Sequence, residues 1–108
     1  GQGWQKTKRY EGTKNTDKDS YIYYIPAESA DNIYLVCDIT EYDTTAVGDK
    51  GIEVYVNDKL IGNIDSKGTT KLKVGYVSGD ELLTVKFHAD NAEYTLYSIS
   101  LDKGQAET

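Results

Sequence analysis

The fold is decided by the stretch GIEVYVNDKLIGNI, residues 51–64. Aliphatic side chains at 52, 54 and 56 alternate with polar or aromatic ones, which is typical of a half-buried β-strand. Asn57 and Asp58 then predict the tip of a tight turn, because both residue types tolerate the positive φ that such turns require. The stretch therefore predicts an antiparallel hairpin over residues 52–64.

Other short runs rich in β-branched and aromatic residues flank this hairpin. We expect strands over residues 4–13, 21–25, 33–40, 71–77, 82–88 and 93–101. Within them, alternation predicts that Leu72, Val74 and Tyr76 share one face. It also predicts that Leu83, Val85 and Phe87 face inward, with Thr84, Lys86 and His88 facing outward.

The remaining segments are predicted as connections. They are residues 14–20, 27–32, 41–50, 65–68, 78–80 and 90–92, with one helical turn over 26–30 and a frayed tail over 102–108. About eight short strands with regularly spaced turns indicate a sandwich or a barrel. The largely polar loop of ten residues over 41–50 is long for a hairpin and favours a chain that crosses between sheets. We therefore expect one all-β domain, a two-sheet antiparallel β-sandwich of jelly-roll-like form.

The charge of the chain limits its partners. Twelve basic and 18 acidic residues give a net charge of −6, and the two signs are interspersed. Such a surface offers no positive field to a phosphate backbone, so nucleic acid and anionic membrane surfaces are not expected partners. The apolar runs of about five residues are also too short to cross a bilayer.

The start of the sequence bears on the origin of the chain. The chain contains no methionine and opens Gly1-Gln2-Gly3, which indicates a cleaved tag or a piece excised from a larger protein. Any membrane or targeting segments of that parent then lie outside this chain.

The single cysteine, Cys37, is in phase with the aliphatic residues of its strand and is expected to be a buried, inert thiol.

The sequence offers little for catalysis. The one thiol, Cys37, and the one imidazole, His88, are predicted on an inner and an outer face, so they do not form a nucleophile and base pair. Paired carboxylates are expected by chance in so acidic a chain and do not indicate a glycosidase. We expect neither an enzyme nor a cofactor.

Residues 15–19 carry the alternating oxygen ligands that begin a calcium loop. Ser20 stands at the glycine position and Pro26 at the last ligand position, so the segment is not an EF-hand. A structural calcium held by Asp17, Asp19 and backbone carbonyls remains an alternative to the simpler expectation of no metal site.

Aromatic residues are the feature most open to a functional interpretation, because the chain has ten tyrosines. Aromatic rings bind sugars by packing against the C–H groups of a pyranose, while nearby polar groups fix the hydroxyls. The candidate ligand-binding residues are Trp4, Tyr21, Tyr23, Tyr24 and Tyr55. The alternative is that these tyrosines only cover a small core.

Several motifs resemble the C-terminal extracytoplasmic region of YfhO-type bacterial membrane proteins, which are related to glycosyltransferases that use lipid-linked sugars. The motifs are Tyr23-Tyr24-Ile25-Pro26, Ile33-Tyr34-Leu35-Val36, Ile52-Glu53-Val54-Tyr55-Val56-Asn57-Asp58-Lys59, and the run over residues 72–85. The resemblance implies a module outside the membrane, tethered to the membrane part of its own parent chain. The family's catalytic acids lie between its membrane spans, so the resemblance carries no catalytic residue to this chain.

Three hypotheses follow from the sequence. The first is a non-catalytic, Gram-positive-type extracytoplasmic module that contacts cell-envelope glycans for a membrane-bound parent. The second is a secreted carbohydrate-binding or adhesion domain of another parent. The third is a structural spacer.

Overall fold

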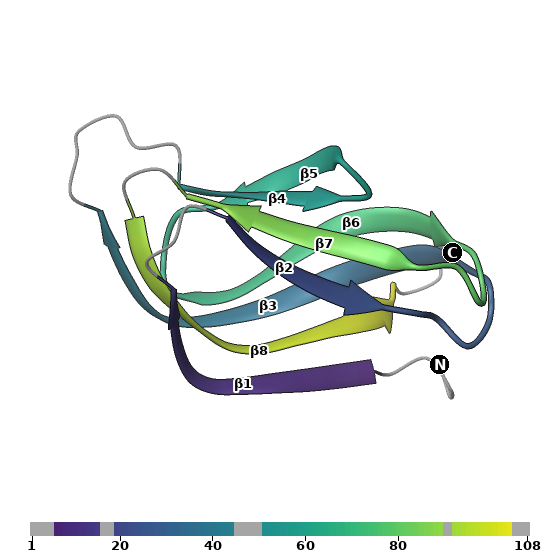
Figure 1. Cartoon of the computed structure of the whole chain (residues 1–108), viewed down its shortest axis with the longest axis horizontal. Helices are drawn as coiled ribbons and strands as arrows, with labels where there is room; N and C mark the ends of the chain where they lie inside the picture. The colour runs from purple at the N-terminus through teal and green to yellow at the C-terminus, as the bar shows by residue number, and fades with distance from the viewer. Residues whose placement is uncertain (1–5, 16–18, 45–50, 90–91, 105–108) are drawn as a thin grey trace.

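The computed structural model describes residues 6–15, 19–44, 51–89 and 92–104. It contains eight strands in two layers and, within those ranges, no helix (Figure 1). The strands are β1 (Lys6–Asn15), β2 (Asp19–Tyr24), β3 (Ala30–Thr44), β4 (Ile52–Val56), β5 (Lys59–Ile64), β6 (Gly68–Val77), β7 (Leu83–His88) and β8 (Ala92–Lys103). The predicted all-β sandwich is confirmed.

The strands form two four-stranded antiparallel sheets, in the orders β1-β8-β3-β6 and β2-β7-β4-β5. Each strand is followed along the chain by one in the other sheet, except where β4 turns directly into β5. This alternation between two packed sheets is the jelly-roll arrangement that the sequence predicts. In Figure 1 the sheet with β2, β7, β4 and β5 lies in front of the other.

The core lies between the two sheets and draws on both. β3 contributes Ile33, Leu35, Cys37 and Ile39, while the facing sheet contributes the alternate residues of β4 and β7. Among the residues whose burial is described, the largest fully buried side chain is Phe87, whose ring centroid lies 6.4 Å from that of Tyr94 in β8. The predicted inward faces of β4 and β7 and the predicted burial of Cys37 are confirmed.

The β4–β5 hairpin turns at the two predicted residues. Asn57 and Asp58 have φ values of 50° and 69°, the left-handed pair that a two-residue hairpin turn needs. Asn57 also joins β7, since its backbone N–H donates to Thr84 O at 2.8 Å and its Oδ1 accepts from Thr84 N at 3.0 Å. The turn therefore continues the pairing of β4 with β7.

We expect Asp58→Val to destabilise the protein by about 1–2 kcal/mol, because a β-branched residue is strained at the positive φ of this position. Lys59→Val is the control: that residue is exposed and has no positive φ, so its cost should stay within about 0.5 kcal/mol. Urea unfolding of both variants measures the difference. Equal losses would contradict the strained turn.

Several connections and the tail are shorter than predicted, because hydrogen bonding extends the strands into polar sequence. β1 ends at Asn15, β3 at Thr44 and β8 at Lys103, and four strands begin earlier than expected. The prediction of loop or tail is therefore wrong for residues 14–15, 19–20, 30–32, 41–44, 68, 92 and 102–103. Glu41 pairs with Thr95, whose hydroxyl also donates to the Glu41 carboxylate at 2.9 Å. Antiparallel partners thus override the polar composition of these segments.

The predicted helical turn over residues 26–30 does not form. Pro26 O accepts from Asp80 N at 2.8 Å and Ser29 Oγ accepts from Gly79 N at 2.8 Å. These bonds tie the β2–β3 connection to the β6–β7 connection. The segment therefore satisfies its polar groups through tertiary contacts, and β3 begins at Ala30.

The predicted face of β6 is wrong for Tyr76. A register shift occurs where Gly75, with φ of 94°, opposes Ile33, and the alternation changes phase there. Val77 is therefore buried, while Tyr76 is 62% exposed. Leu72 and Val74 stay on the inner face and pack against the core.

Candidate functional site

The candidate site is the outer face of the sheet β2-β7-β4-β5. Strand pairing arranges its outward side chains in rows across the sheet. One row is polar and contains Asp19, His88, Glu53 and Asn63; the next contains Tyr21, Lys86, Tyr55 and Leu60; the third contains Tyr23 and Thr84. We call these residues the outer array.

Two tyrosines of β2 form the aromatic edge of the outer array. Tyr21 and Tyr23 are 50% and 56% exposed, and their rings are parallel within 5° at a centroid distance of 6.3 Å. They are two residues apart, so the pleat of the strand directs both outward. Two stacked rings held on a strand form a surface that needs little ordering before a ligand packs on it.

A third tyrosine lies in the centre of the array. Lys86 Nζ lies 4.6 Å from the centroid of the Tyr55 ring, a cation–π contact across the β7–β4 pair. The same lysine is the register partner of Tyr21. Lys86 thus separates the aromatic edge from Tyr55 and places a positive charge between them.

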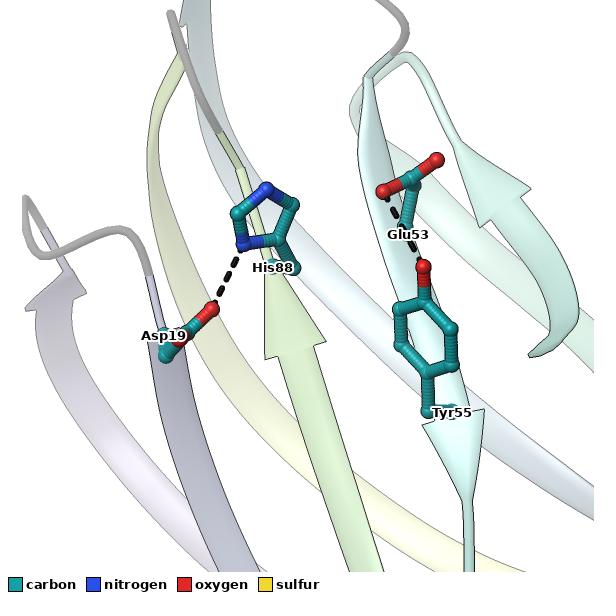
Figure 2. Close-up of polar contacts among 4 residues, drawn as sticks. All are labelled: Asp19, Glu53, Tyr55 and His88. Carbon is teal, nitrogen blue, oxygen red and sulfur yellow. Dashed lines mark hydrogen bonds and ion pairs between the residues drawn. The ribbon is translucent and has the colours of Figure 1, made fainter. Parts of the chain in front are cut away.

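The polar row is held by two contacts. His88 Nδ1 lies 2.6 Å from Asp19 Oδ1, and Tyr55 OH donates to Glu53 Oε1 at 3.3 Å (Figure 2). Figure 2 shows Asp19 and His88 turned toward each other across β2 and β7, with Glu53 and Tyr55 on neighbouring β4. Desolvation, followed by the Glu53 carboxylate, raises the pKa of the Tyr55 hydroxyl, so this phenol remains a neutral donor.

The structure brings together three of the five predicted ligand-binding residues, namely Tyr21, Tyr23 and Tyr55. The prediction that Tyr24 lies with them is wrong. Tyr24 is half-buried on the inner side of β2 and packs against the core. Burial also raises its pKa. Trp4 lies outside the described residues.

Sequence reasoning left Lys86, His88 and Glu53 out of the candidate site. Their outward phase on β7 and β4 was predictable from alternation. Their position beside Tyr21 and Tyr55 was not, because it depends on β7 pairing with both β2 and β4. His88 faces outward as predicted, but it contacts Asp19 as well as solvent.

Cys37 and His88 lie on an inner and an outer face, as the sequence predicts, and the structure places them in different sheets. Burial raises the pKa of the thiol to about 12, so it is a poor nucleophile near neutral pH. A hollow at one end of the sandwich, beside Tyr76 and Leu82, has a volume of about 130 Å³. That is below the roughly 300–1,000 Å³ typical of small-molecule sites.

Of the two residues considered for calcium, Asp17 lies outside the described residues and Asp19 pairs with His88. Among the residues that the structure describes, no three His, Cys, Asp or Glu side chains form a group that could hold a metal ion. The same residues contain no helix long and apolar enough to span a membrane.

Comparison with known proteins finds no matching family model, no matching curated protein and no matching solved structure. The resemblance to YfhO-type proteins therefore stays a prediction. The outer array itself is the basis for a functional proposal.

Proposed function

We propose that this chain is a non-catalytic, glycan-contacting β-sandwich module. The observation that carries the proposal is the parallel, exposed pair Tyr21 and Tyr23 at the edge of the outer array. A pyranose presents C–H groups on its faces and hydroxyls around its rim. Parallel aromatic rings suit the faces, and the neighbouring polar row suits the rim.

The charged groups of the outer array support a sugar over a purely apolar ligand. The carboxylates of Asp19 and Glu53 accept hydrogen bonds from hydroxyls, while Lys86 donates to them. These groups lie within two strands of the tyrosine pair. An array that mixes rings, acceptors and donors matches the amphipathic surface of a carbohydrate.

The cellular setting of the proposal comes from the sequence motifs. We place the module outside the cytoplasm at the bacterial cell surface, tethered by the membrane part of its parent chain. There it would contact cell-envelope glycans for a parent involved in glycosylation. A secreted carbohydrate-binding or adhesion domain uses the same outer array without a membrane parent.

The proposal is tested by NMR titration with soluble cell-wall polymers. We expect chemical-shift changes at Tyr21, Tyr23 and Tyr55, and about tenfold or greater loss of affinity in Tyr21→Ala/Tyr23→Ala, since each stacked ring contributes roughly 0.5–1.5 kcal/mol. Tyr76→Ala is the control, because it removes a similarly exposed tyrosine from the other sheet. Unperturbed tyrosine signals across the polymers would favour the structural spacer.

A further inference from the structure

Within the described part of the chain, the two sheets end in four edge strands: β1 and β6 in one sheet, β2 and β5 in the other. An edge strand presents unpaired backbone donors and acceptors on which another chain can add a strand. Proteins block such edges with charged side chains, lysine above all, and with bulges that break the regular pairing.

Three of the four edges carry both devices. Each has a register shift against its neighbour. Each also contains basic residues, namely Lys6, Lys8, Arg9 and Lys14 in β1, Lys59 in β5, and Lys71 and Lys73 in β6. These strands are therefore poor templates for an additional strand.

β2 carries neither device. It contains no lysine or arginine, and its pairing with β7 runs without a shift from Asp19 and His88 to Tyr24 and Leu83. Asp19, its only charged residue, stands at the first position. The five residues 20–24 are an uncharged, largely aromatic run of high β-propensity.

The inner side of β2 is also incompletely covered. Ile22 and Tyr24 are only half-buried, whereas Val85 and Phe87, the inward residues of neighbouring β7, are buried. A strand added to β2 would extend the sheet and shelter these two side chains. Burying apolar surface would then add to the backbone hydrogen bonds.

We propose that β2 pairs with β2 of a second copy of this chain, antiparallel, to join the two four-stranded sheets into one. In an antiparallel pair, residues opposite each other lie on the same face of the sheet, so the two-fold axis must lie where one residue faces the same residue of the other copy. We place it where Ile22 of one copy faces Ile22 of the other. With the axis at Ile22, Tyr21 of each copy faces Tyr23 of the other. Asp19 then falls outside the paired run, so no like charges meet.

The sequence of β2 favours a second copy over an unrelated strand. The run is self-complementary in this register, since isoleucine meets isoleucine inside and tyrosine meets tyrosine outside. Two-fold pairing of one edge also closes the assembly, because each copy uses its β2 once. The pairing would place both tyrosine edges side by side on one continuous face.

Sedimentation equilibrium of the chain tests the pairing. At about 0.15 M salt, where surface charges are screened, we expect the mass to rise from 12.0 kDa toward twice that value as concentration increases to about 1 mM. A mass that stays at 12.0 kDa over this range would overturn the proposal.

Charge substitutions on the outer side of β2 test the register. Tyr21→Glu/Tyr23→Glu places glutamates opposite each other in both tyrosine pairs and should raise the dimer dissociation constant about tenfold or more. Tyr21→Glu/Tyr23→Lys places opposite charges there and should restore dimerisation. Because both variants replace the same exposed residues, any loss of folding is shared, and circular dichroism checks it.

The matched control puts the same added charge on the other edges. Leu60→Glu/Tyr76→Glu replaces exposed residues of β5 and β6 and should leave the dimer intact. A dimer weakened equally by the control would show that another surface or net charge governs association. A dimer insensitive to both glutamates on β2 would exclude β2 as the interface.

Discussion

Phe87→Ala should lower the free energy of unfolding by about 3–5 kcal/mol, the range typical of a fully buried phenylalanine. Phe87 is 1% exposed and contacts the ring of Tyr94 across the two sheets. Removing its ring leaves a cavity at the centre of a core that consists of only two layers. Since domains of this size are stable by about 5–15 kcal/mol, the variant should be close to unfolding.

Urea denaturation followed by circular dichroism measures this loss. Lys86→Ala is the control, because it lies next to Phe87 on β7 but faces outward over Tyr55. Its cost should not exceed about 1 kcal/mol, the contribution of an exposed cation–π contact. Similar losses in the two variants would contradict the assignment of the two faces of β7.

The same comparison bears on the outer array. β7 carries Phe87 inside and Thr84, Lys86 and His88 outside, so one strand links the core to the candidate site. Lys86→Ala should therefore change the surface without unfolding the protein. Phe87→Ala should lower the folded fraction of the protein, and with it the amount of intact surface.

The parts of the fold that sequence predicts well are those with a strictly local signal. The β4–β5 hairpin follows from alternation and from the residue types Asn57 and Asp58, both of which depend on neighbours in sequence. The inward and outward faces of β7 follow in the same way. The sheet switching was predicted from the length of the polar segment 41–50. That reasoning reached the right topology although β3 runs to Thr44 and takes up four of these residues.

The parts that sequence does not predict depend on partners distant in the chain. The change of register at Gly75 exists only because β6 pairs with β3, and this change turns the side chain of Tyr76 outward. Residues 41–44 read as loop because they are polar, yet β8 supplies their hydrogen bonds. Only part of the outer array could be predicted from the sequence. Its tyrosines are a local feature, whereas their proximity to Lys86 follows from the strand order.

Stability at alkaline pH should depend on Cys37. Burial among the core residues of β3 raises the pKa of its thiol from 9.0 to about 12. Between these values the unfolded chain releases the proton and the folded chain retains it, so stability is unaffected below about pH 9 and falls as pH rises from there toward 12. The slope approaches about 1.4 kcal/mol per pH unit, which amounts to a loss of about 2 kcal/mol at about pH 10.5.

Urea unfolding at several pH values from neutral to about 10.5, with Cys37→Ala as the comparison, isolates this contribution. The variant loses a side chain and starts less stable, but its stability should fall less steeply above pH 9 because it has no thiol to titrate. Tyr24 and Tyr55, whose pKa values are also raised, titrate in both proteins and cancel in the difference. Parallel curves would mean that the folded chain releases the thiol proton as easily as the unfolded one, and that Cys37 is not sealed in the core.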